Sequence, residues 1–151
     1  MMPFLSWRNQ YRVGVADIDQ EHHYLFELIN EFHDSHRGGA DEKALAQILN
    51  RLVQYAEEHF RHEEESMLES EYPLHAEHCA LHEALYMTIF RLSEELAAGS
   101  LRIDRDTHRF LRNWLVEHII KHDLAFGDYF ARRAKAMANG EQESSEEAGA
   151  Q

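Results

Sequence analysis

Hydrophobic positions along the chain repeat every three or four residues in four long segments, residues 18–33, 45–59, 74–96 and 111–129. This spacing places the apolar side chains on one face of an α-helix, whereas the alternation typical of a β-strand is nowhere sustained. The pattern therefore predicts four amphipathic helices and an all-α fold.

Residues that end helices lie between these segments. Gly38 and Gly39 follow the first segment, with Asp41 as a candidate N-cap for the second. Pro73 separates the second segment from the third, and Gly99 separates the third from the fourth. Because connections this short make neighbouring helices antiparallel, we expect an up-down-up-down four-helix bundle.

We expect the chain to divide into three parts. An N-terminal arm, residues 1–16, holds Trp7 and Tyr11 and packs across the bundle, which spans residues 17–138. Residues 139–151 contain four glutamates, no basic residue and no large apolar residue. A segment of this composition cannot bury enough surface to offset its ordering entropy, so it is predicted to be a disordered acidic tail.

Charge and composition exclude several classes of function. The chain of 151 residues has 15 Lys and Arg against 28 Asp and Glu, which gives a net charge of −13. This charge argues against nucleic-acid partners and against docking on anionic membranes. A single cysteine excludes an intrachain disulfide. No run approaches the roughly 20 apolar residues of a membrane span, and no secretory signal is apparent, so we expect a cytoplasmic protein without membrane insertion.

Twelve histidines are the most unusual feature of the composition, and five of them fall within the apolar stripes. An unpaired polar ring is costly in such a position. In an antiparallel bundle the start of the first helix, the end of the second and the start of the third share one end of the core, and the middle of the fourth reaches the same level. We therefore predict that these five side chains converge: His22, His59, His78, His82 and His118.

These imidazoles, with Glu63 and one further acidic residue, would be too many donors for one tetrahedral zinc ion. Two ions bridged by carboxylates suit the set better, and iron or manganese fits this mixture better than zinc. Helix geometry alone favours His122, about 40° around the helix from His118, over Asp123 at about 140°.

The remaining histidines are predicted to lie outside the site. His33 and His36 are too far along the first helix, and His75 and His108 fall near helix starts, where we expect them to be exposed. His62 lies on the flank of the second stripe and is a candidate for an outer hydrogen-bond partner of a ligand.

The chain resembles the bacterial, single-domain members of the hemerythrin family from about residue 7 to residue 130. The matching motifs are Trp7-x3-Tyr11, Ile18-Asp19-x2-His22, His59-Phe60-x2-Glu63-Glu64, His78-x3-His82 and Trp114-Leu115-x2-His118-Ile119-x3-Asp123. One departure is Glu21, where the family usually has glutamine before the first histidine. We expect no loss of metal from that change.

The resemblance implies a non-haem di-iron centre with an oxo or hydroxo group between the two Fe ions. One iron would be held by His78, His82 and His118, the other by His22 and His59, with Glu63 and Asp123 bridging both. The second iron would be one ligand short, and dioxygen would bind there. The implied apolar lining of the dioxygen pocket is Leu25, Phe60, Trp114, Leu115 and Ile119. Since the family pattern selects Asp123 over His122, we expect a local widening of the fourth helix near Lys121.

The predicted function is reversible dioxygen binding for storage, delivery or transport, and not enzymatic turnover. In the family, bound dioxygen is reduced to a hydroperoxide while both irons become ferric, and the change reverses. The alternatives are an oxygen- or NO-sensing module and a di-iron oxidase or peroxidase. The histidine-rich donor set and the lack of any Glu-x-x-His motif in the sequence disfavour the enzyme. An oxygen-consuming enzyme is the expected recipient, and the protein is expected to be a monomer.

Overall fold

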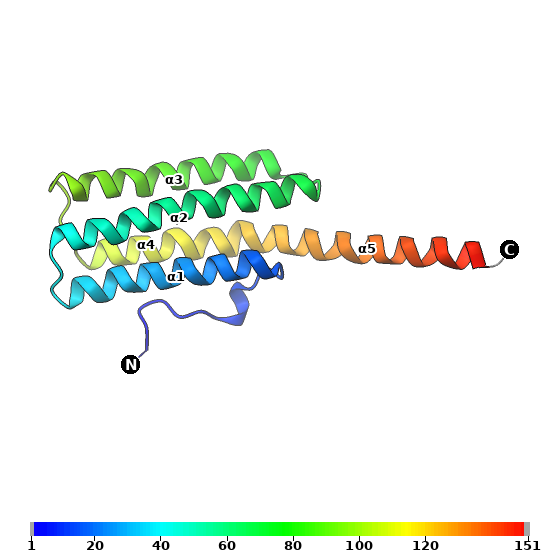
Figure 1. Ribbon diagram of the computed structural model, residues 1–151, viewed down its shortest axis with the longest axis horizontal. Coiled ribbons are helices and arrows are strands. Elements are labelled where there is room, and N and C mark those ends of the chain that lie inside the picture. The colour runs from blue at the N-terminus through cyan, green and yellow to red at the C-terminus, as the bar shows by residue number, and fades with distance from the viewer. Residues whose placement is uncertain (1, 150–151) are drawn as a thin grey trace.

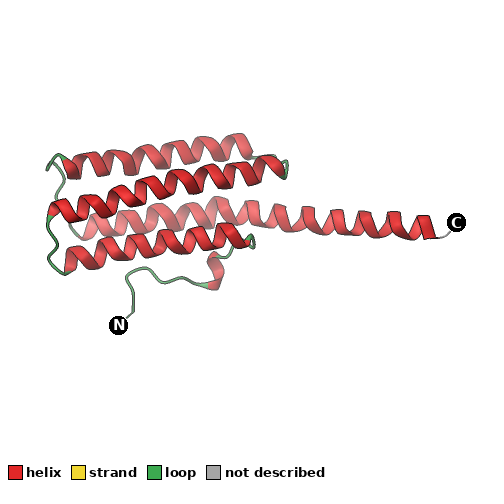
Figure 2. Ribbon diagram, in the orientation of Figure 1, coloured by secondary structure: helices red, strands yellow, loops and turns green. Residues whose placement is uncertain are grey.

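The computed structural model describes residues 2–149, with side chains described through residue 140. Its helices are α1 (Ala16–Arg37), α2 (Glu42–Glu69), α3 (His75–Ala97), α4 (Arg105–His118) and α5 (Leu124–Gly149), with a 3-10 turn η1 (Asn9–Tyr11) and a π-helical turn η2 (Ile119–Asp123). Because α4, η2 and α5 run on without interruption, the bundle consists of four rods of alternating direction (Figure 1). Helices and loops account for all the described residues (Figure 2). The predicted all-α antiparallel four-helix bundle is confirmed.

The helix ends follow the signals in the sequence. The Asp41 side chain accepts a hydrogen bond of 2.8 Å from the backbone of Ala44 and caps α2, as predicted. Asp104 caps α4 by accepting from the backbone of Thr107 at 3.0 Å. Gly99 has a φ of 75°, a left-handed conformation that glycine adopts without strain, and it lies just beyond the end of α3.

The residues predicted to be metal ligands lie between two groups of packed apolar side chains. A large core cluster includes Leu25 of α1 and Phe60 of α2, whereas a smaller cluster includes Ile18, Met67 and Phe126. In α1, in α2 and in the rod formed by α4, η2 and α5, the predicted ligands lie between a residue of the smaller cluster and a residue of the larger one. Apolar packing on both sides therefore sets the level at which the polar side chains meet.

The N-terminal arm packs against the bundle through buried side chains and specific hydrogen bonds. Leu5 is buried, and both its backbone N–H and its carbonyl pair with the Asn30 side chain at 2.8 Å. Nearer α1, the Asp19 carboxylate accepts from the backbone N–H of Val13 at 2.7 Å and from that of Gly14 at 3.1 Å. These contacts fix the arm at two points along α1.

Near the C-terminal end of α1, three histidines cluster beside Phe4 of the arm. His33 and His36 belong to α1, and His108 belongs to α4. The Phe4 ring stacks on His33 with 4.2 Å between centroids, and His36 Nδ1 lies 2.9 Å from His108 Nε2. The prediction that His108 is exposed is wrong, since only 6% of it is accessible. Burial, together with the neighbouring His33 and His36, lowers its pKa to about 4. The sequence position near a helix start gave no sign of Phe4 and the α1 residues that cover it.

Helix α5 is longer than the sequence pattern suggests. It continues to Gly149 and projects beyond the other rods, through residues predicted to belong to a disordered tail (Figure 1). Alanine, glutamate and glutamine in this segment favour local helix formation. Residues 150 and 151 lie outside the described residues, and the domain boundary at residue 138 stays a prediction. None of the described helices is both long and apolar enough to cross a membrane.

Replacing Gly127 by alanine should lower the free energy of unfolding by about 1–3 kcal/mol, because the new methyl group would overpack the contact between α5 and the arm. A Cβ atom at Gly127 would lie 2.1 Å from the Val13 carbonyl oxygen, whereas one at Gly140 in the same helix would meet nothing. Gly140→Ala is therefore the matched control and should not destabilise the protein. Denaturant unfolding measures both, and equal stability of the two variants would contradict this packing.

Replacing His108 by phenylalanine should make stability less sensitive to acid. The pKa of His108 is near 6.5 in an unfolded chain and about 4 in the fold. The unfolded state therefore binds the proton first, so stability falls as the pH decreases from 6.5 and the loss is complete below about 4. Unfolding curves of both proteins between pH 7 and pH 4 should diverge, with the wild type losing more. Parallel curves would show that His108 is not buried in its neutral form.

Candidate metal centre

All four rods contribute to one buried polar layer, and all seven residues predicted as metal ligands lie in it. Helix α1 supplies one of them, α2 and α3 supply two each at a spacing of one turn, α4 supplies its last residue and η2 its last residue. None of the seven is more than 6% exposed. They are His22, His59, Glu63, His78, His82, His118 and Asp123.

The donor atoms divide into two groups that share both carboxylates. Within each group, one donor atom of every residue lies within 4.8 Å of the others. We call the side with His78, His82 and His118 the three-histidine half, and the side with His22 and His59 the two-histidine half. Glu63 and Asp123 belong to both halves.

Each carboxylate directs one oxygen to each half. Glu63 Oε1 lies 2.9 Å from the Nε2 of His78 and 3.3 Å from that of His82, whereas Oε2 lies 3.4 Å from the Nε2 of His22 and of His59. Asp123 repeats the division, with Oδ1 3.0 Å from the Nε2 of His78 and Oδ2 3.1 Å from that of His22. This is the arrangement that two carboxylates need if they are to bridge a pair of ions.

The π-helical turn brings Asp123 into the layer. In a regular α-helix Asp123 would point about 140° away from His118. The wider turn η2 inserts one additional residue, so that Asp123 is buried while the side chain of His122 is half-buried and belongs to neither donor group. The expected widening of the helix near Lys121 is confirmed.

Many polar atoms of the layer, in His22, His82, Glu63 and Asp123, have no hydrogen-bond partner among the described residues. In the part of the chain that the structure describes, both nitrogens of His22 and of His82 and all four carboxylate oxygens of Glu63 and Asp123 are buried without a hydrogen bond. Buried polar atoms are normally satisfied, and so many unsatisfied atoms in one place require a ligand between them. Imidazole nitrogens facing carboxylate oxygens form a donor set that fits transition-metal ions.

The charges of the layer depend on one another. Burial would lower the pKa of His22 and of His78, but the adjacent Asp123 and Glu63 carboxylates raise these values to about 10 and about 9. Burial would raise the pKa of Glu63, yet four surrounding imidazoles hold it well below its usual range. The two carboxylates therefore stay negative and require either protons on the imidazoles or a bound cation.

Comparison with known proteins places the chain in a family. The model of the hemerythrin HHE cation binding domain matches residues 13–129. A bacteriohemerythrin from Methylococcus capsulatus is 32% identical over 127 residues, covering 83% of this chain and 96% of the relative. A myohemerythrin from Riftia pachyptila is 32% identical over 120 residues, covering 80% and 88%. A crystal structure of wild-type hemerythrin superposes with a TM-score of 0.77 at 31% identity, covering 83% and 96%.

The chain belongs to the hemerythrin family. The family domain spans the arm from Val13 onward and all four rods, so it includes every residue of the two donor groups. Together the family and the donor groups support a non-haem metal centre in this layer.

The five residues expected to line a dioxygen pocket are all buried beside the centre, at Leu25, Phe60, Trp114, Leu115 and Ile119. The Phe60 ring stacks on His82 with 4.2 Å between centroids, and Trp114 Nε1 donates to the Leu85 carbonyl at 3.2 Å. Hollows of about 380 Å³ and 280 Å³ in the bundle surface reach His82 and His118, respectively. Among these five residues, Phe60 thus covers one face of a ligand in the three-histidine half.

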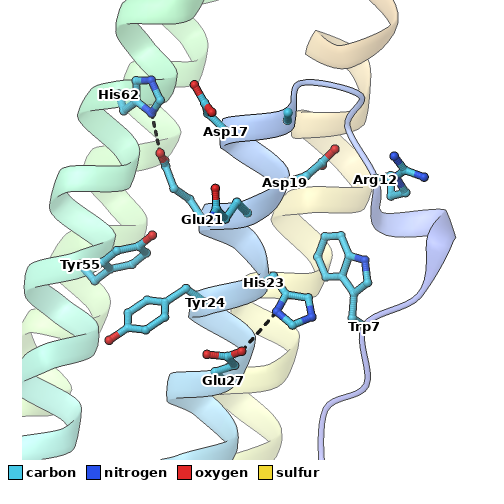
Figure 3. Close-up of a pocket in the computed structure, with 12 residues that line it drawn as sticks. Trp7, Arg12, Asp17, Asp19, Glu21, His23, Tyr24, Glu27, Tyr55 and His62 are labelled. Carbon is cyan, nitrogen blue, oxygen red and sulfur yellow. Dashed lines mark hydrogen bonds and ion pairs between the residues drawn. The ribbon is translucent and has the colours of Figure 1, made fainter.

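Sequence analysis missed the role of Glu21. Its Oε1 accepts from His59 Nδ1 at 2.7 Å. Its Oε2 accepts from His62 Nδ1 at 2.6 Å (Figure 3). These two hydrogen bonds outweigh the effect of burial and lower the pKa of the Glu21 carboxyl. His62 was a candidate for such an outer partner, and its three-residue spacing from His59 on α2 was the available signal. By contrast, His23 pairs with Glu27 at the surface, where both are more than half exposed.

Proposed function

We propose that the chain binds dioxygen reversibly at a non-haem di-iron centre. The observation that carries this proposal is the division of the Glu63 and Asp123 oxygens between two groups of imidazoles. In the proposed centre His78, His82 and His118 hold one iron, His22 and His59 hold the other, and the two carboxylates bridge them. This donor set supplies five neutral nitrogens and two negative charges, which suits a pair of iron ions better than a single zinc ion.

The unequal halves suggest where a gas molecule binds. The two-histidine half offers one imidazole fewer, so an ion there keeps a position open for a small ligand. When bound, the iron pair supplies electrons that dioxygen takes up on binding and returns on release. Leu25, Phe60 and Ile119 are buried, and Phe60 packs against His59 of the two-histidine half with 5.8 Å between ring centroids. Such apolar side chains would keep water and protons away from this position, which favours reversible binding over the loss of reduced oxygen.

Carrier and enzyme differ in what happens after the gas binds. The relatives are named hemerythrins, and the dominance of imidazole over carboxylate in the donor groups supports binding rather than oxidative turnover. Storage, delivery and sensing of oxygen or NO would all use the same centre. The recipient enzyme, the monomeric state and the cytoplasmic location stay predictions from the sequence.

Anaerobic loading with ferrous iron should give two irons per chain, and exposure to air should then produce a visible absorption band. Because reversible binding returns the electrons to iron, argon should remove the band and air should restore it over several cycles. Metal analysis and optical spectra measure both results. A colourless protein with no bound iron would contradict the di-iron centre, whereas irreversible bleaching in the first cycle would indicate turnover and contradict the carrier.

Asp123→Ala should reduce bound iron from two per chain to one or fewer, because it removes an oxygen from each half and one of the two negative charges. His122→Ala alters the adjacent residue outside both donor groups and should retain two irons. Metal analysis after identical loading compares the two variants. The reverse result would assign the ligand to His122 and would contradict the inward position of Asp123.

A further inference from the structure

Among the predicted ligands, His59 has an anchor on its outer side. Its Nε2 faces the centre, 3.4 Å from Glu63 Oε2, while its Nδ1 donates to Glu21 Oε1 at 2.7 Å. A hydrogen bond at Nδ1 fixes the tautomer that leaves the Nε2 lone pair free for a metal. The His59 side chain is only 1% exposed, so in this structure Glu21 is the acceptor at Nδ1 in place of water.

Glu21 is itself held in place. Its second oxygen accepts from His62 Nδ1, so two imidazoles from one face of α2 fix a carboxylate that belongs to α1. The carboxylate lies at a hollow of about 1080 Å³ between the arm, α1 and α2, and Figure 3 shows His62 pointing toward Glu21 across this hollow. The side chain of His62 is 40% exposed, whereas that of Glu21 is 20% exposed.

Two of the other ligands, His22 and His82, lack comparable support among the described residues. Neither His22 Nδ1 nor His82 Nδ1 has a hydrogen-bond partner in the described part of the chain. The nearest carboxylate oxygen to His82 Nδ1 belongs to Glu64 and lies 3.8 Å away, which is too far for a hydrogen bond. The anchor therefore acts on the half that has only two imidazoles, where losing the orientation of one removes half of the nitrogen donors.

We infer that Glu21 is a positioning residue for the two-histidine half, orienting His59 toward the metal while His62 holds the Glu21 carboxylate. This inference rests on the proposed di-iron function. It assigns Glu21 an effect on one half of the centre. The expectation that glutamate in place of the family's glutamine causes no loss of metal still applies, because the side-chain oxygen of either residue can accept from His59 Nδ1.

Iron release from the loaded full-length chain tests this role without any measurement of oxygen binding. After anaerobic loading with ferrous iron, a chromophoric ferrous chelator reports the release of each ion. In Glu21→Ala one iron should leave roughly 10- to 100-fold faster than in the wild type, as is typical when an outer partner of a ligand is lost. The second iron should leave at the wild-type rate.

Two further variants separate positioning from other effects. Glu21→Gln keeps an oxygen that accepts from His59 Nδ1, so its release rate for the faster iron should lie between those of the wild type and Glu21→Ala. Glu27→Ala is the matched control, because Glu27 lies on the same helix and the same hollow, and its one ion pair in the described part of the chain is with the exposed His23. It should release both irons at wild-type rates. Circular dichroism verifies that each variant is folded.

Several results would overturn the inference. Wild-type release of both irons from Glu21→Ala would show that the anchor has no effect, and equal acceleration of both would indicate general loosening. A Glu21→Gln rate equal to that of Glu21→Ala would exclude positioning through the hydrogen bond. If Glu21→Ala does not fold, His62→Ala must release one iron several-fold faster, and an unchanged rate would overturn the role. A wild type that fails to load two irons overturns the proposed function itself, which distinguishes the two failures.

Discussion

Two carboxylates buried in the middle of a helical bundle are the constraint on which the rest of the structure depends. Leaving one charge buried and unpaired costs on the order of several kcal/mol, and Glu63 and Asp123 are both essentially inaccessible. Five imidazoles surround them, but imidazoles compensate these charges only when they carry protons or hold a cation. The fold is therefore built around a site that requires positive charge, and its apolar packing places that requirement at one level of the four rods.

The π-helical turn follows from the same constraint. A regular helix through residues 119–123 would bury His122 and turn Asp123 outward, which would leave Glu63 as the only negative group of the two donor groups, among six imidazoles. The widened turn gives up regular α-helical hydrogen bonding over five residues to place a second carboxylate in the layer. Such an irregularity is stable because α4 and α5 continue on either side as parts of one packed rod (Figure 1).

Most of the fold could be predicted from the sequence because the three- and four-residue spacing is sustained and the breakers lie between the stripes. The spacing also places five histidines inward, since facing the core depends on angle around the helix. The spacing could not select Asp123, because in an ideal helix this residue points about 140° away from His118. The resemblance to the family was needed to identify it as a ligand. The sequence predicted the exposure of His108 wrongly, because the periodicity of a helix does not indicate which residues the N-terminal arm covers. The Glu21 anchor was missed because it joins α1 to α2. The spacing of His59 and His62 indicated a shared face of α2, but it could not identify the α1 carboxylate that binds both.

The residues that support the arm and those that support the two-histidine half are neighbours on α1. Within the first two turns of α1, Asp19 binds the arm backbone at Val13, Glu21 holds His59, and His22 faces the centre. On the opposite side of Val13 lies Gly127, four residues after Asp123, where the arm approaches too closely for any side chain. Val13 thus lies between the helix segments that present His22 and Asp123. Through Val13 the arm therefore contacts both the segment of α1 that presents His22 and the helix that follows Asp123.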